Sequence, residues 1–166
     1  MKDKIVLVGF MGSGKTTVGK LLSKVLKIPF VDLDEEIVKR TNMSIPCIFE
    51  KFGEERFREI ERKTLVEFLL KPKNLVISTG GGAPTYKNNM ELINKNSVSV
   101  YLKTDFEKLW ERISKDSNRP LVRLGKEKVR DLLKRRLSHY EKAKIIIRTD
   151  ELTPEEVVKK ILPEVS

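Results

Sequence analysis

The chain has 166 residues, of which 34 are Lys or Arg and 24 are Asp or Glu, so its formal net charge is +10. This length fits a single domain spanning residues 1–166 and leaves little room for a second. No apolar run approaches the roughly 18 residues that a membrane-spanning helix requires, and the N-terminus leads straight into an apolar strand pattern. We therefore expect a cytoplasmic protein with no membrane partner.

The positive charge is concentrated in one segment. Between Arg112 and Arg148, thirteen bases stand against four acids, so this segment carries +9 of the net charge. Nucleic acid, an anionic membrane surface and a small polyphosphate ligand are the candidate partners for such a segment. Composition alone does not choose among them.

The single cysteine, Cys47, has no second cysteine with which to pair and no neighbouring Cys or His at metal-ligand spacing. We expect it to be a small apolar filler in a reducing cytosol.

Apolar patterns predict alternating strands and helices along the chain. Short apolar runs predict five strands, at residues 5–9, 28–32, 75–79, 98–102 and 144–148. Helical spacing predicts helices at residues 15–26, 34–40, 44–70 with a break at Gly53, 105–114, 132–143, and from 153 onward. Residues 115–125 have weak periodicity and are expected to form a mobile loop. This alternation favours a parallel sheet with helices on both faces, and ligands bound at the carboxyl ends of its strands.

A phosphate-binding motif lies between the first strand and the first helix. Residues 9–16 read G-F-M-G-S-G-K-T and fit the pattern G-x-x-x-x-G-K-[ST] in the context that this motif requires. Its glycines let backbone N–H groups converge on phosphates, Lys15 can reach the β and γ phosphates, and the Thr16 hydroxyl can coordinate Mg²⁺. The motif therefore implies a nucleoside triphosphate with Mg²⁺.

Two carboxylates follow the second strand. Asp32 and Asp34 stand two residues apart, whereas the third strand ends in Ser78 and Thr79 without a carboxylate. If the chain is still extended there, both side chains point the same way relative to the sheet. One can then help to hold Mg²⁺ through water while the other takes an acceptor hydroxyl. The alternative is that either residue only caps the next helix.

A third group of residues predicts a pocket for a small, hydroxylated anion. Arg58 and Glu61 fall three apart on one helical face, so Glu61 can orient a guanidinium fork that suits a carboxylate. Phe49 and Phe57 can wall the same pocket. The run Gly80, Gly81 and Gly82 would let a substrate lie against backbone N–H groups. The alternatives are an ordinary solvated charged helix and a plain turn.

Together these motifs resemble the shikimate kinase family. They are, in chain order, G-F-M-G-S-G-K-T-T, D-L-D, S-I-P-C-I-F-E-K-F-G-E-E-R-F-R-E-I-E, S-T-G-G-G and N-R-P-L. The resemblance implies a three-layer α/β P-loop kinase fold with a five-stranded parallel sheet. It also implies ATP-dependent phosphorylation of the 3-hydroxyl of shikimate in chorismate biosynthesis. The implied parts are a core (1–32, 71–111 and 143–166), a substrate-binding region (about 33–61) and a lid (about 115–125).

The resemblance also assigns roles by position. The residues implied to bind ATP are Gly12, Ser13, Gly14, Lys15, Thr16, Thr17, Arg112, Arg119 and Pro154. Those implied to bind shikimate are Asp34, Phe49, Phe57, Arg58, Glu61, Gly80, Gly81, Gly82 and Arg136. Mg²⁺ would be held by Thr16 and Asp32, and the catalytic residues would be Lys15, Asp34 and Arg119. We expect a monomer without a nucleic-acid partner.

Two other interpretations remain at this point. Another small-molecule kinase on the same fold, such as a gluconate or nucleotide kinase, would share the phosphate loop without needing both the F-R-x-x-E helix and the three glycines. A nucleic-acid-binding NTPase would use the basic segment, but such proteins interleave stacking aromatics among the bases. Residues 112–148 offer only Tyr140.

Overall fold

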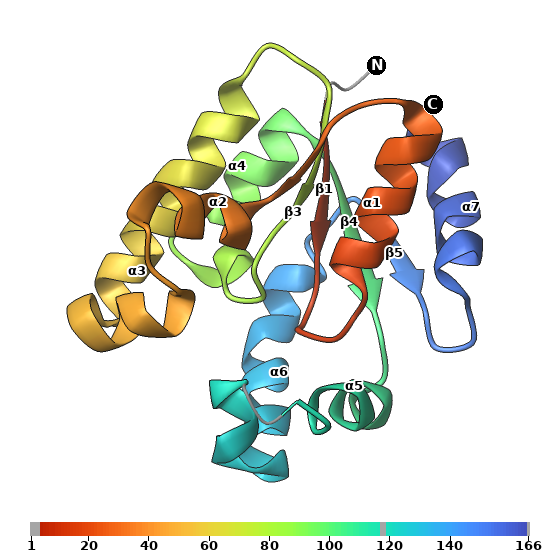
Figure 1. The fold of residues 1–166 in the computed structure, drawn as a ribbon. Coiled ribbons are helices and arrows are strands. Elements are labelled where there is room, and N and C mark those ends of the chain that lie inside the picture. Colours follow the sequence, from red (N-terminus) through yellow and green to blue (C-terminus); the bar gives the residue numbers. More distant parts are fainter. Residues whose placement is uncertain (1–3, 117–118, 166) are drawn as a thin grey trace.

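A computed structural model describes residues 4–116 and 119–165. Its centre is a five-stranded sheet in the order β2-β3-β1-β4-β5 (Figure 1), in which every neighbouring pair of strands is parallel. The strands are β1 (Lys4–Val8), β2 (Phe30–Asp32), β3 (Leu75–Ser78), β4 (Val98–Lys103) and β5 (Ile145–Arg148). The predicted parallel α/β fold is confirmed.

The helices alternate with these strands along the chain. The α-helices are α1 (Lys15–Leu26), α2 (Leu33–Thr41), α3 (Ile45–Leu70), α4 (Asn89–Asn96), α5 (Phe106–Ile113), α6 (Lys126–Tyr140) and α7 (Pro154–Val165). Two 3₁₀ turns, η1 (Ala83–Thr85) and η2 (Pro120–Leu124), complete the described elements. No helix of the described ranges 4–116 and 119–165 combines the length and apolarity needed to cross a membrane.

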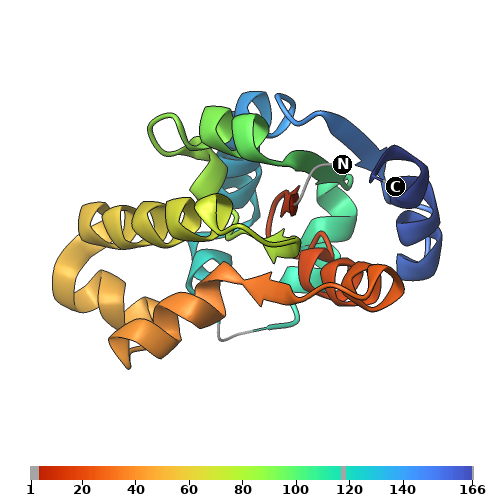
Figure 2. The same cartoon turned by 90° about the horizontal axis from the view of Figure 1, so that it is seen from above.

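Helices cover both faces of the sheet (Figure 2). Because side chains alternate along a strand, Ile5 and Leu7 of β1 pack on one face, with α1 and α7, while Val6 and Val8 pack on the other, with α3 to α6. β1 is buried throughout, as a central parallel strand should be. The sheet is therefore a rigid frame, and its strands all end at the edge where the phosphate loop begins.

Helix α3 contains the break that was predicted at Gly53. This residue has φ of +85°, a left-handed conformation that favours glycine, and it interrupts the helical backbone. The second half of the helix consequently takes a new direction and carries Arg58 and Glu61 toward the sheet. A small separate core joins α2 to both halves of α3 and consists of Ile37, Ile48 and Phe57.

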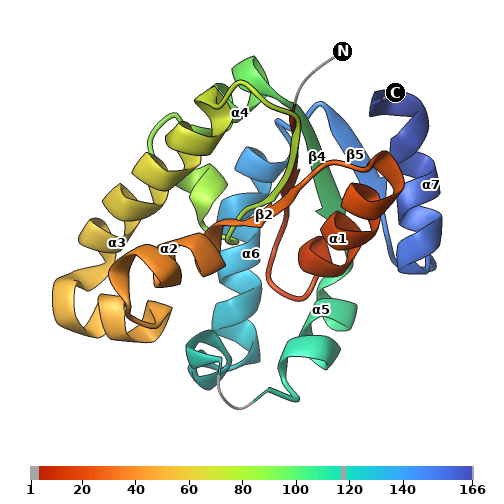
Figure 3. The ribbon, with the colours of Figure 1, turned by 45° about the horizontal axis from the view of Figure 1, so that its top comes forward.

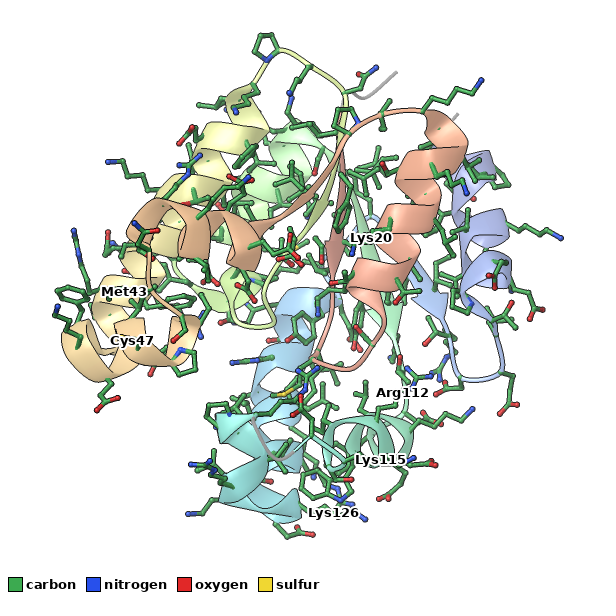
Figure 4. The ribbon with its side chains drawn as sticks, in the orientation of Figure 1. Lys20, Met43, Cys47, Arg112, Lys115 and Lys126 are labelled. Atoms are coloured by element: carbon green, nitrogen blue, oxygen red, sulfur yellow. The ribbon has the colours of Figure 1, made fainter. Side chains whose placement is uncertain are left out.

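Four sequence-based expectations need correction. β2 begins at Phe30 rather than residue 28, because Pro29 has no N–H to donate. Helix α4 and the turn η1 were not predicted. Helix α6 begins at Lys126 rather than 132, and the last part of the expected loop forms η2. Cys47 is exposed on the first turn of α3 (Figure 4), so the expectation of a packed filler was wrong.

Candidate active site

The phosphate loop turns sharply from β1 into α1. Gly12 has φ of +83°, and a Cβ there would lie 2.8 Å from the Ile113 side chain, so only glycine fits. The Lys15 Nζ donates to the carbonyls of Gly9 (2.6 Å) and Phe10 (3.0 Å). The loop therefore closes around the ammonium group that is predicted to meet the phosphates.

Two buried polar groups in this loop suit a phosphate. Burial lowers the pKa of Lys15 to about 8, partly opposed by the nearby carboxylate of Asp34. The Ser13 hydroxyl is buried, and within residues 4–116 and 119–165 it finds no hydrogen-bond partner. A phosphate bound at the N-terminus of α1 would satisfy the hydroxyl and return a counter-charge to the lysine.

Lys15 leads to a prediction for the ligand-free protein. The folded state binds fewer protons than the unfolded chain between about pH 8 and 10.5, so the Lys15 contribution to the free energy of unfolding rises with pH across that range. At pH 7 the buried charge is therefore destabilising. We expect Lys15→Met to raise the free energy of unfolding at pH 7 by about 1–2 kcal/mol, after the two lost hydrogen bonds are counted.

Thermal melting of the ligand-free variants tests this expectation. Lys20→Met is the matched control, because Lys20 lies on the same helix with its side chain exposed (Figure 4), and its melting temperature should stay near that of the wild type. ATP should stabilise the wild type and not Lys15→Met. A ligand-free Lys15→Met protein that melts below the wild type would contradict the assignment.

Asp32 serves two purposes at the end of β2. Its Oδ1 accepts hydrogen bonds from the backbone N–H groups of Asp34 (2.9 Å) and Glu35 (3.2 Å), which caps α2. Its Oδ2 accepts a hydrogen bond from the Thr16 hydroxyl at 3.3 Å. The capping alternative is thus correct for one oxygen, while the other faces the phosphate loop.

These oxygens suit Mg²⁺. Magnesium typically takes one or two protein oxygens and completes its octahedron with water and substrate phosphates. Thr16 and Asp32 offer such a pair, 3.3 Å apart. Within the described chain there is no group of three or more Cys, His, Asp or Glu side chains that could form an all-protein cage.

Asp34 lies in the first turn of α2, where the chain has already left the extended conformation. The assumption that Asp32 and Asp34 point the same way along a strand was therefore wrong. Instead the Asp34 carboxylate lies against the glycine run. A Cβ added to Gly80 would be only 3.0 Å from Asp34 Oδ1. Burial raises the pKa of Asp34, with a further contribution from the charge of Asp32, while Lys15 and Arg58 oppose the shift.

Arg58 and Glu61 form the predicted ion pair. The Arg58 Nη1 donates to Glu61 Oε1 at 2.8 Å, and the two side chains are only 12% and 1% exposed. Burial raises the pKa of Glu61 to about 7, although the charge and hydrogen bond of Arg58 lower it. A Cβ at Gly82 would overlap the Arg58 guanidinium, so a larger residue there would displace this group from the glycine run. The ion pair thus holds a guanidinium over the glycine run.

The aromatic wall and the second arginine lie nearby. The rings of Phe49 and Phe57 stack with their centroids 4.6 Å apart. On α6, the Arg136 guanidinium lies over the Phe10 ring at 5.7 Å, and a Cβ at Gly81 would be 3.0 Å from its Nη1. Two guanidinium groups, Arg58 and Arg136, therefore reach the same glycine backbone from opposite helices.

These groups line one cleft of about 1110 Å³. Its lining residues come in part from α2, α3, α6 and the phosphate loop, whose arrangement can be followed in Figures 1 and 3. The predicted residues that the structure brings together here are Asp34, Phe49, Phe57, Arg58, Glu61, Gly80, Gly81, Gly82, Arg119 and Arg136. Met11 of the phosphate loop lines the same cleft, so the two parts of the site are adjacent.

Some predicted residues lie outside this cleft, and some lining residues were not predicted. Arg112 and Pro154 are not among its lining residues. Arg112 instead donates to the Gly12 carbonyl at 2.9 Å. The lining residues that sequence reasoning missed include Met11, Leu121, Leu132 and Arg135. Only the four-residue spacing of Leu132 and Arg136 on one helical face could have suggested any of them.

Of the lid expected at residues 115–125, the structure describes residues 115, 116 and 119–125, and residues 117 and 118 lie outside the described ranges. Arg119, Pro120, Leu121 and Leu124 line the cleft, and Arg119 Nε lies 3.3 Å from Asp116 Oδ2. Gly125, with φ of +93°, joins this segment to α6. The lid segment therefore forms one wall of the cleft.

Many bases of the charged segment already have local partners. Glu107 on α5 accepts from Lys126 (2.8 Å) and from Arg130 (2.9 Å), which ties α5 to the start of α6. Figure 4 shows Lys126 at this end of the molecule, below the cleft. The concentrated charge thus serves partly as internal ion pairs, and Arg119, Lys128, Arg135 and Arg136 face the cleft.

A loop shaped for a nucleoside triphosphate, next to a cleft that carries guanidinium and carboxylate groups, has the layout of a P-loop phosphotransferase. The family model described as shikimate kinase matches residues 11–166. The chain belongs to the shikimate kinase family, which phosphorylates shikimate with ATP.

Known relatives agree over nearly the full length. The chain is 46% identical to the shikimate kinase of Thermodesulfovibrio yellowstonii, across 96% of this chain and 93% of that protein. It is 42% identical to the shikimate kinase of Acinetobacter baumannii, solved in complex with shikimate, with a TM-score of 0.92 and coverage of 99% and 93%. A gluconokinase from Sinorhizobium meliloti, at 18% identity and a TM-score of 0.59, shares the fold alone.

Proposed function

We propose that this protein transfers the γ-phosphoryl group of ATP to the 3-hydroxyl of shikimate, with shikimate bound in the described cleft and ATP bound at the phosphate loop. The observation that carries the proposal is the position of Arg58 and Arg136 over the glycine run, with Asp34 between this run and the phosphate loop. The two guanidinium groups suit one carboxylate, and Asp34 suits a hydroxyl. The bound shikimate of the A. baumannii enzyme supports this choice of acceptor.

The nucleotide side follows from the phosphate loop. Backbone N–H groups of residues 12–17 and the Lys15 ammonium would hold the phosphates, while Arg112 and Pro154 would lie on the adenine side. Thr16, with Asp32 acting through water, would hold Mg²⁺, which when bound supplies positive charge next to the β and γ phosphates. Lys15 and Arg119 would add to the compensation of charge on the transferred group.

Transfer then depends mainly on positioning. Phosphoryl transfer requires in-line alignment of the attacking hydroxyl with the γ-phosphate and compensation of the negative charge on the transferred group, more than it requires a strong base. Asp34 would orient the 3-hydroxyl and accept its proton as the new bond forms. Its raised pKa, caused first by burial, makes the carboxylate a better acceptor than an exposed aspartate. The Arg58–Glu61 pair would hold the other end of the ring.

An acceptor panel tests the proposal. ADP release should be fast with shikimate and near background with gluconate, a nucleoside monophosphate or water. Gluconate or nucleotide turnover exceeding shikimate turnover would overturn it. Salt-dependent RNA binding without shikimate turnover would instead favour an NTPase that acts on nucleic acid.

The segmentation of the chain is part of the same proposal. Residues 33–61 would bind shikimate and residues 115–125 would act as a lid on a core of 1–32, 71–111 and 143–166. We expect a cytoplasmic monomer. The pairing of Lys126 and Arg130 with Glu107 supports a structural use for part of the basic segment.

Lid closure gives a further prediction. A kinase must exclude water from the γ-phosphate, and Arg119 and Leu121 already lie in the cleft wall. Hydrogen exchange of peptides covering residues 119–125 should slow on adding an ATP analogue together with shikimate. Peptides from α7 that lie beyond Pro154 serve as the internal control. Unchanged exchange in 119–125 under saturating ligands would contradict closure.

A further inference from the structure

Tyr140 ends α6 with its hydroxyl inside the molecule, directly behind the acceptor site. The side chain is 0% exposed. Its hydroxyl donates to the Gly81 carbonyl at 2.6 Å. In the sequence, Tyr140 stands out only as the single aromatic residue of the segment 112–148, and nothing there assigns its hydroxyl a role.

The same hydroxyl also lies beside Arg136. This arginine lies one turn earlier on α6, and both groups reach the same glycine: a Cβ at Gly81 would lie 3.0 Å from Nη1 of Arg136 and 3.7 Å from the Tyr140 hydroxyl oxygen. Burial raises the pKa of Tyr140 to about 12, with Arg136 opposing the shift, so the hydroxyl keeps its proton at neutral pH. One O–H group therefore donates to the Gly81 carbonyl at the point where the Arg136 guanidinium also reaches this glycine.

Both partners need such support. Glycine backbones have wide conformational freedom, and Gly81 is the middle member of a run of three. Fixing its carbonyl fixes the plane of the peptide bond between Gly81 and Gly82. Arg136 has a long side chain whose many rotamers must narrow to one before its fork can meet a carboxylate. A single buried hydroxyl that is bonded to the Gly81 carbonyl and lies beside the Arg136 guanidinium would hold the two groups in fixed positions relative to each other.

We propose that Tyr140 is a positioning residue for the acceptor, which aligns the Gly81 peptide and the Arg136 guanidinium before shikimate binds. The inference rests on the proposed function, because it takes Gly81 and Arg136 as shikimate-binding groups. It assigns Tyr140 no contact with substrate. The ring fills the core and is needed for packing, whereas the hydroxyl serves the site.

Tyr101 offers a matched control. Its ring packs on Tyr140 with centroids 5.2 Å apart, and it is buried in the same core cluster. The ionisable groups that act on its hydroxyl are Tyr140, Glu141 and Arg148, whereas those that act on the Tyr140 hydroxyl are Arg136 and Arg58 of the site. Tyr101→Phe and Tyr140→Phe therefore each remove one hydroxyl from the same cluster, and only the second removes a hydrogen bond to the glycine run.

Steady-state kinetics and thermal melting of both variants test the proposal. Tyr140→Phe should raise the KM for shikimate by about five- to tenfold, the effect of one buried hydrogen-bonded group, with the KM for ATP within about twofold of wild type. Tyr101→Phe should leave both KM values within about twofold. An unchanged KM for shikimate in Tyr140→Phe overturns the proposal. So does a parallel rise in both KM values that Tyr101→Phe reproduces, or a Tyr140→Phe chain that does not fold, because either result assigns the hydroxyl to stability.

Arg136→Met separates this proposal from the function on which it rests. If Arg136→Met leaves the KM for shikimate unchanged, the proposed binding mode itself fails. If Arg136→Met raises that KM and Tyr140→Phe does not, the binding mode stands and the positioning role fails. When Tyr140 acts through Arg136, the double variant should show less than the product of the two separate fold-changes.

Discussion

Replacing Asp34 with Asn should lower kcat by about 10²–10⁴-fold, with the fold retained. Asn keeps the size of the side chain and can still hydrogen-bond a hydroxyl, but it cannot accept the proton that leaves the acceptor as the bond to phosphorus forms. The KM for ATP should change little, because Lys15 and the loop backbone hold the phosphates. Steady-state kinetics at saturating ATP and shikimate measure the effect.

Glu35→Gln is the control for this variant. Glu35 neighbours Asp34 in the first turn of α2, and its side chain is exposed, so neutralising it changes the local charge equally without touching the cleft. We expect near wild-type turnover from it. Full turnover by a folded Asp34→Asn protein would remove Asp34 from the chemistry and leave it as part of the packing around Gly80.

The second large effect is expected at Arg58. Arg58→Met removes half of the carboxylate clamp, which should raise the KM for shikimate by about 100-fold, the loss expected for a charge-assisted pair in a buried site. It also leaves Glu61, which is 1% exposed, without its partner. The free energy of unfolding should fall by about 3 kcal/mol as a result.

A double variant separates these two consequences. In Arg58→Met with Glu61→Gln, no charge stays buried without a partner, so most of the lost stability should return. The KM for shikimate should stay high, because the clamp is still incomplete. Urea unfolding and shikimate kinetics on the single and double variants give both quantities. If stability and KM recover together, Arg58 acts on shikimate only through the fold.

Features encoded by local sequence could be predicted well. The phosphate loop depends on a contiguous pattern, and Arg58 and Glu61 depend on a spacing of three within one helix. The structure places these side chains as the spacing indicates, with an Arg58–Glu61 distance of 2.8 Å. The five strands also lie within one or two residues of their predicted bounds, because buried parallel strands give continuous apolar runs.

Features that depend on tertiary packing could not be predicted from the sequence. Helix α4 is short and mostly polar, and its buried Asn89 is stabilised by the Ala83 carbonyl and by Arg62, which are contacts that no local pattern encodes. Asp34 lines the cleft as predicted, but the extended backbone assumed for it was wrong. Helix α2 begins at Leu33, one residue earlier than expected, so Asp34 is already helical. Cys47 is exposed because it lies on the solvent-facing side of α3. Its burial had been predicted from residue type alone, which does not show which side of a helix faces solvent.

The most direct test is a crystal structure with shikimate and a non-hydrolysable ATP analogue. The account predicts the shikimate carboxylate between Arg58 and Arg136, the 3-hydroxyl on Asp34, and the γ-phosphate next to Lys15 in line with that hydroxyl. A shikimate molecule whose carboxylate faces the phosphate loop, or which lies outside the cleft, would contradict it.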